Sequence, residues 1–96
     1  MHLHTLNQSP AQSQVYRQAL AAMADDDCLL LIEEAVQGAL PHLIGPFEGL
    51  AGRLYVLEED LVARGLLERC DDNARVVDVE GFVSLTEQAD KVLSWY

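Results

Sequence analysis

The sequence predicts an α/β fold: a small three-layer structure in which a parallel sheet of four to five strands lies between helices. Two observations carry this prediction. Apolar runs of strand length alternate with segments of helical periodicity, separated by short loops. In addition, residues 28–32 (CLLLI) are apolar without alternation, which is typical of a strand buried on both faces. The length of 96 residues suits one domain, so we expect residues 1–96 to form it together.

Four segments have the length and composition of strands. They are residues 3–6 (LHTL), 28–32 (CLLLI), 53–57 (RLYVL) and 75–79 (RVVDV). Because helical segments connect them, right-handed crossovers would make them parallel, in a doubly wound sheet. The segment 91–96 (KVLSWY) has two interpretations, as a short fifth strand or as a docking segment.

The first helix is predicted to begin near Ser9, with Ser9 as N-cap, Pro10 in the first helical position and Gln12 completing a capping box. Apolar residues then recur on one helical face: Tyr16, Ala19, Leu20 and Met23.

The second helix is expected over residues 34–40, with an inward face of Val36, Ala39 and Leu40. Proline and glycine then break the pattern. We therefore expect residues 42–52 to be irregular or to contain one short extra turn.

The third helix has the clearest boundaries. Its first turn is acidic, Arg64 lies in its last turn, and Gly65 suits the left-handed position after the helix. The acidic residues are Glu58, Glu59 and Asp60. The fourth helix is expected over residues 81–89, burying Phe82, Val83 and Leu85.

The charge balance excludes several kinds of partner. There are 16 acidic and 6 basic side chains, a net charge of −10, and no basic stripe to bind nucleic acid or an anionic membrane surface. No apolar run reaches the roughly 18 residues of a membrane helix. The start of the chain lacks the regions of a signal peptide. Two cysteines make no disulfide framework, so we expect a reduced, cytoplasmic protein.

Cys28 follows three aspartates and opens the second predicted strand. A reactive thiol needs its thiolate stabilised by cations and must be reachable by its partner. Neighbouring carboxylates and burial both oppose ionisation, so we interpret Cys28 as a packing residue. Cys70 lies in a polar loop (ERCDDN), where Arg69 favours ionisation and two aspartates oppose it. We interpret it as an ordinary surface thiol.

No metal, cofactor or catalytic residue is predicted. His2 and His4 share one face of the first strand, but a closed zinc site needs four ligands and His42 lies in an irregular segment. The loop 7–10 (NQSP) lies at the carboxyl edge of the sheet, where α/β proteins bind ligands. It has no glycine for close phosphate approach, and Ser9 has no identifiable base.

Glu33 and Glu34 follow the second strand at the same edge. Paired carboxylates are capable of acid–base work, but acids at a helix start usually complement its dipole, and we favour that role. Trp95 and Tyr96 are candidate partner-interface residues, because these residue types are enriched in interface cores. Packing within the chain is an equally good interpretation.

Four separate segments resemble the TusB/DsrH family of sulfur-relay subunits. They are LHTLNQSP, LLLIEEAVQGAL, LYVLEEDLVARGL and VVDVEGFVSLTEQADKVLSW. The resemblance runs from Leu3 to Trp95, and its most specific parts are EDLVARGL (59–66) and the terminal SW.

The resemblance implies a DsrE/F/H-like fold and a cytoplasmic heterohexamer with TusC-like and TusD-like subunits. Such a complex takes persulfide sulfur from a TusA-like donor and passes it to a TusE-like acceptor, for 2-thiolation of the tRNA wobble uridine. The principal sulfur-bearing cysteine then belongs to the TusD-like subunit, and this chain is a non-catalytic member.

The sequence departs from the pattern at two points. Some DsrH relatives of sulfur-oxidising pathways carry a cysteine in the first helix, at or near Ala19 here, and neither Cys28 nor Cys70 matches it. Many relatives have a histidine where Ala89 stands. The absence of the first-helix cysteine favours the tRNA-thiolation branch over a dissimilatory role. Three alternatives stand beside the leading one: a sulfur-carrying subunit using Cys28 or Cys70, a DsrH-type subunit of dissimilatory sulfur oxidation, and a small-molecule-binding regulator at the strand edge.

Overall fold

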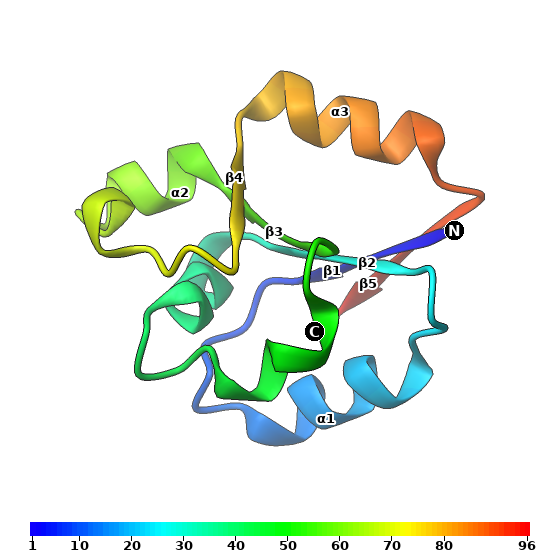
Figure 1. Ribbon diagram of the computed structural model, residues 1–96, viewed down its shortest axis with the longest axis horizontal. Coiled ribbons are helices and arrows are strands. Elements are labelled where there is room, and N and C mark those ends of the chain that lie inside the picture. The colour runs from blue at the N-terminus through cyan, green and yellow to red at the C-terminus, as the bar shows by residue number, and fades with distance from the viewer.

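The computed structural model describes residues 1–96 and contains a five-stranded sheet whose paired strands are all parallel, in the order β4-β3-β2-β1-β5 (Figure 1). The strands are β1 (His2–Leu6), β2 (Cys28–Leu31), β3 (Leu54–Leu57), β4 (Arg75–Val77) and β5 (Lys91–Trp95). All four predicted strands are confirmed, and the segment 91–96 forms the fifth. The strand predicted over 75–79 ends two residues early, because Asp78 caps a helix that begins at Val79.

The connections lie on both faces of the sheet. The α-helices are α1 (Ser13–Ala22), α2 (Glu58–Ala63) and α3 (Val79–Gln88), and the 3₁₀ helices are η1 (Glu33–Ala39), η2 (Gly45–Leu50) and η3 (Leu67–Arg69). From β1 to β4 each new strand is added on the same side of the preceding one, so the sheet grows toward the β4 edge. The connection through α3 then returns across the sheet and adds β5 on the other side of β1. Right-handed crossovers therefore put α1 and α3 on opposite faces, as Figure 1 shows.

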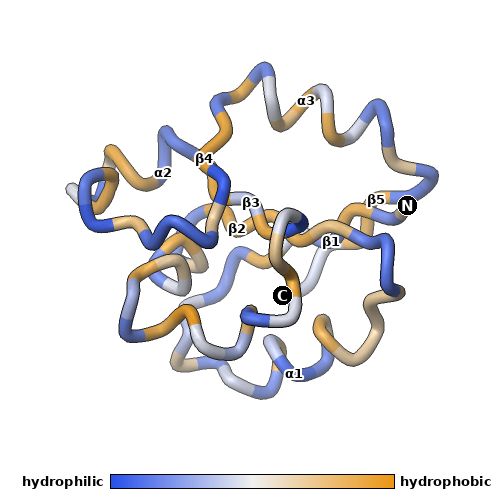
Figure 2. The backbone as a smooth tube through the Cα atoms, in the orientation of Figure 1, coloured by the Kyte–Doolittle hydropathy of each residue, from blue (hydrophilic) through white to orange (hydrophobic).

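The two faces are unequally packed. A cluster of 15 buried residues joins the sheet to α1, η1, η2 and α2, and Figure 2 shows apolar residues along the central strands. On the α3 face only four residues form the buried cluster: Leu3, Cys28, Leu30 and Leu85. The fully buried central strand β2 contributes alternate residues to both clusters, as its unbroken apolar run predicts.

The first helix begins at Ser13 rather than at Ser9. The Ser9 carbonyl accepts a hydrogen bond from the Gln12 N–H (2.9 Å), and its hydroxyl accepts one from the Ala11 N–H (3.2 Å), so Ser9 closes a separate turn. Gln12 is the N-cap, without a side-chain hydrogen bond. The predicted inward face is confirmed, with Tyr16 and Ala19 buried and Leu20 and Met23 packed against the larger cluster.

The predicted second helix is the 3₁₀ helix η1, and its predicted inward residues Val36, Ala39 and Leu40 are buried. The expected short turn within 42–52 is η2. The ends of α2 are close to prediction, with Arg64 as C-cap and Gly65 at φ +67°.

The fourth helix begins two residues earlier than predicted, because the Asp78 carboxylate accepts a hydrogen bond from the Gly81 N–H (2.8 Å). Leu85 is buried and Phe82 is half-buried, but the prediction for Val83 is wrong, since its side chain is 48% exposed. Residues 82, 85 and 89 form the row that faces the sheet, and Val83 lies beside that row together with Val79.

Candidate functional site

A buried polar network joins three segments that are distant in the sequence. His4 on β1 is fully buried, and its Nε2 lies 3.0 Å from Oδ2 of Asp27, which is only 3% exposed. Trp95 on β5 donates its indole N–H to His4 Nδ1 at 3.0 Å. Since the indole nitrogen is only a donor, His4 Nδ1 must be unprotonated and Nε2 must carry the proton donated to Asp27.

Asp27 also accepts hydrogen bonds from the backbone N–H groups of His2 and Ala24, both at 2.9 Å. Burial alone would raise the pKa of Asp27, but these two bonds and His4 together hold that pKa well below its usual range. A buried carboxylate is thus satisfied by three donors. The network leaves no ring nitrogen of His4 free for a substrate, so we interpret it as structural.

Both thiols lie in surroundings that oppose the thiolate. Burial raises the pKa of Cys28, and although Arg53 lowers it, Asp27 and Asp26 raise it further. This agrees with the interpretation of Cys28 as a packing residue, since it belongs to the buried cluster on the α3 face.

Cys70 is half-buried and packs against the larger cluster on the other face. Burial, Asp71 and Asp72 all raise the pKa of Cys70. The effect of Arg69 that the sequence suggested is not found. Cys70 is therefore less of a surface thiol than the sequence suggested. The two sulfur atoms pack in different clusters, so the fold does not bring them together as a pair.

The two glutamates after β2 tie η1 to α2, Glu33 through its backbone N–H and Glu34 through its carboxylate. The Glu33 N–H donates to Asp60 Oδ2 at 2.6 Å, and Arg64 donates to Glu34 Oε1 from both Nη2 (2.6 Å) and Nε (3.1 Å). Arg64 also lies 3.9 Å from Asp60. Glu34 thus acts in an ion pair rather than only at a helix start. We favour a structural role for the Glu34 carboxylate over acid–base chemistry.

No group of three or more His, Cys, Asp or Glu side chains has the proximity that a metal ion requires. None of the helices combines the length and the apolar composition of a membrane-spanning segment. Of the candidate interface residues, Trp95 is half-buried in the network described above, whereas Tyr96 is 78% exposed.

The sequence did not reveal the His4–Asp27–Trp95 network. A signal was present in Asp27, the last of three aspartates and the only one directly before a buried strand, where a carboxylate needs partners. The partners themselves become visible only from the pairing of β1 with both β2 and β5.

Comparisons with known proteins agree with this fold. The chain resembles the crystal structure of the ychN protein from E. coli with a TM-score of 0.76 over 97% of both chains, at 18% identity. The arrangement is therefore that of DsrE/F-like α/β proteins.

The model of the family described as DsrH like protein matches residues 8–92, and the chain belongs to this family. Two similar relatives each carry the name Protein TusB. The one from Pectobacterium parmentieri is 34% identical, and the one from Yersinia pestis (strain Pestoides F) is 32% identical. Each match spans 97% of this chain and 99% of the relative.

Proposed function

We propose that this chain is a non-catalytic, TusB-type subunit of a cytoplasmic persulfide sulfur-relay complex that serves 2-thiolation of the tRNA wobble uridine. Within that proposal it assembles with TusC-like and TusD-like subunits into a heterohexamer. A TusA-like donor delivers sulfur and a TusE-like acceptor removes it. Membership of the DsrH-like family and the full-length relatives named TusB support the proposal.

The observation that carries the non-catalytic role is the state of the two thiols. A sulfur carrier attacks as a thiolate, and in this chain burial and neighbouring aspartates raise the pKa of both Cys28 and Cys70. Sulfur chemistry then belongs to another subunit. The net charge of −10 also leaves contact with tRNA to a partner.

Exposed apolar side chains support a role in assembly. Large apolar residues are exposed on β4, α3 and β5 and directly after β5: Val76, Val79, Val83, Val92, Leu93 and Tyr96. The outer edge of β5 has no strand beside it. Partner subunits that cover β5 would bury Val92 and Leu93, with Tyr96 and the exposed side of Trp95 in the contact, whereas Val76 lies on β4 at the opposite edge of the sheet.

The test is to express the chain with TusC-like and TusD-like subunits and to measure the mass of the assembly by light scattering. We expect a heterohexamer, and persistence of a free monomer at micromolar concentration would contradict the proposal. A Cys28→Ala/Cys70→Ser double variant then separates the roles. Sulfur transfer through the assembled complex should survive, whereas its loss with the complex intact would assign sulfur carriage to this chain.

A further inference from the structure

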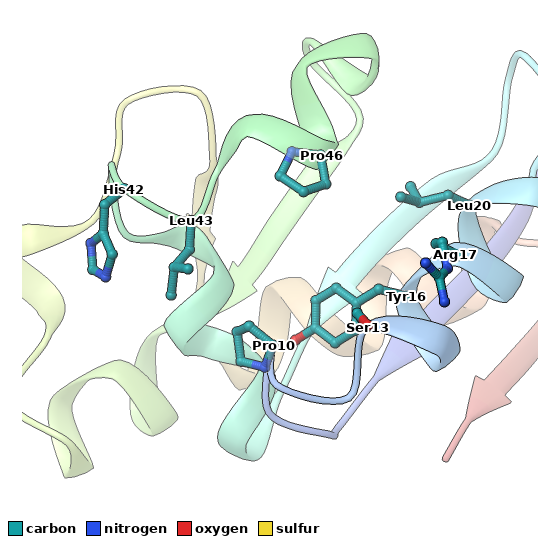
Figure 3. A pocket seen from close by; sticks show the side chains of 8 residues that line it. All are labelled: Pro10, Ser13, Tyr16, Arg17, Leu20, His42, Leu43 and Pro46. Atoms are coloured by element: carbon teal, nitrogen blue, oxygen red, sulfur yellow. The ribbon is translucent and has the colours of Figure 1, made fainter.

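A groove lies between α1 and the segment that joins η1 to η2. It encloses about 330 Å³ and is lined by eight residues: Pro10, Ser13, Tyr16, Arg17, Leu20, His42, Leu43 and Pro46. Figure 3 shows the α1 side chains gathered on one side and His42 and Leu43 on the other. We call this the α1 groove.

The inner wall of the α1 groove is held in place by the core. Tyr16 is 6% exposed, its ring packs against Phe47 at a centroid distance of 5.8 Å, and its hydroxyl donates to the Gln8 carbonyl at 2.8 Å. Pro10 and Pro46 restrict the backbone at two further points of the lining. The groove is therefore formed before any ligand arrives, and its volume lies at the lower end of the range for small-molecule sites, about 300–1,000 Å³.

The lining of the α1 groove contains no acidic residue, although the chain as a whole is strongly acidic. The lining residues fall within 10–20 and 42–46, and none of the 16 acidic residues lies in these two segments. Arg17 is exposed and forms no ion pair with any of them. The stem of an arginine can line an apolar surface while its guanidinium stays in water, where it can hold a carboxylate with two hydrogen bonds.

The surroundings of the α1 groove favour a small molecule over a protein partner. A stable protein interface buries more than about 1,000 Å² and has an apolar centre. The exposed large apolar side chains lie on α2, η3, β4, α3 and β5 and directly after β5, and none lines the groove. The exposed residues of α1 around it are small or polar, such as Gln14, Gln18 and Ala21.

We propose that the α1 groove binds a small monoanion with an aromatic or branched aliphatic body. The anionic group, a carboxylate in the simplest case, pairs with Arg17, and the apolar body packs against Tyr16, Leu20 and Leu43. This site is independent of the assembly role proposed above, since it uses a different surface and neither cysteine.

The test uses three probes with the same ring system: indole-3-acetate, its neutral amide, and the cation tryptamine. Each is titrated into ¹⁵N-labelled protein while backbone amide shifts are followed. We expect indole-3-acetate to shift residues of α1 and of 42–46, and to bind about tenfold more tightly than the amide because of the charge-assisted pair. Tryptamine should bind most weakly.

Arg17→Gln should remove the preference for the acid over the amide, while Arg75→Gln, an exposed arginine on β4, should leave it unchanged. Leu43→Glu should weaken all binding of the acid while the folded spectrum is retained. Three results would overturn the proposal: no shifts at the groove, equal affinity for all three probes, or tighter binding of an acidic peptide with a central phenylalanine.

Discussion

The indole of Trp95 lies edge to edge with the imidazole of His4, with ring centroids 6.1 Å apart and planes inclined by only 16°, and it donates its N–H to Nδ1 of that ring at 3.0 Å. One side chain of β5 is thus joined to β1 by a hydrogen bond between two nearly coplanar rings. On its other side, His4 Nε2 hydrogen-bonds to Asp27, which directly precedes β2. The three segments hold one another in register.

Replacing Trp95 by phenylalanine tests the indole hydrogen bond. Phenylalanine retains an aromatic ring at this position, but it leaves the buried His4 Nδ1 without a donor. We expect the free energy of unfolding to fall by about 1–2 kcal/mol, as measured by urea denaturation. Tyr96→Phe is the control and should change stability by less than about 0.5 kcal/mol. Equal effects of the two changes would show that the bond contributes nothing specific.

Asp27→Asn should be strongly destabilising at neutral pH. An amide cannot accept from all three donors that Asp27 serves, so buried N–H groups lose their partners. We expect a loss of roughly 3 kcal/mol in the free energy of unfolding. The matched control is Asp25→Asn, two residues earlier at an exposed position. A loss of similar size in the control would attribute the effect to net charge.

The same carboxylate predicts a dependence of stability on pH. Its pKa is lower in the folded protein than in the unfolded chain, so the unfolded chain takes up the proton first as the pH falls. The contribution is therefore complete well above pH 4 and is lost as the pH falls from about 4. Unfolding free energies measured between neutral and acidic pH should fall less steeply in Asp27→Asn than in Asp25→Asn. Parallel curves would contradict this.

Alkylation rates test the surroundings of the two thiols. Because the pKa of both Cys28 and Cys70 is raised, both should react with iodoacetamide more slowly than free cysteine at pH 7. The rates should still be rising where free cysteine has reached its plateau. Cys70 should react before Cys28, because Cys28 is buried and Cys70 is only half-buried. The variants Cys28→Ala and Cys70→Ser allow each thiol to be followed alone, and a fast thiol at neutral pH would refute the prediction.

Gly38 lies where η1 meets η2. A Cβ atom there would lie 3.2 Å from Phe47 Cε2 and 3.6 Å from Tyr16 Cε2. Gly38→Ala should therefore lower the free energy of unfolding by about 1–3 kcal/mol through overpacking. Gly49→Ala, whose Cβ would meet nothing within 4 Å, is the control and should be far less affected. The comparison is made by thermal or urea unfolding, and equal losses would show that the Gly38 contact yields easily.

The parallel sheet could be predicted because unbroken apolar runs indicate burial. Residues 28–32 have the composition of a central strand that is covered on both faces. The first turn of α1 could not be predicted, because Ser9 and Pro10 satisfy the rules for a helix start and for a tight turn equally well. Nor could η1, since a seven-residue segment has too few turns to separate a 3₁₀ helix from an α-helix by its periodicity.

The candidate sites were harder to predict from the sequence than the fold. His4, Asp27 and Trp95 each look ordinary in the sequence, and only strand order and register bring them together. The α1 groove likewise contains no motif, because its lining comes from a loop, one helical face, the segment between η1 and η2, and the start of η2. The two cysteines are different, because the sequence already indicated the direction of each pKa shift. For Cys28 the neighbouring aspartates and the apolar run both indicated a raised pKa. For Cys70 the neighbouring aspartates alone did so.

The position of β1 has a consequence for how the protein folds. β1 pairs with β2 across a short crossover, but each residue of β5 pairs with a residue of β1 that lies 89 positions earlier. Closing a loop of that length lowers the chain entropy before the contacts between β1 and β5 add any stabilisation. This pairing should therefore form late in folding. Until then the free side of β1 is an open template for strands of other molecules, and slow closure is the step at which the nascent protein is most exposed to aggregation.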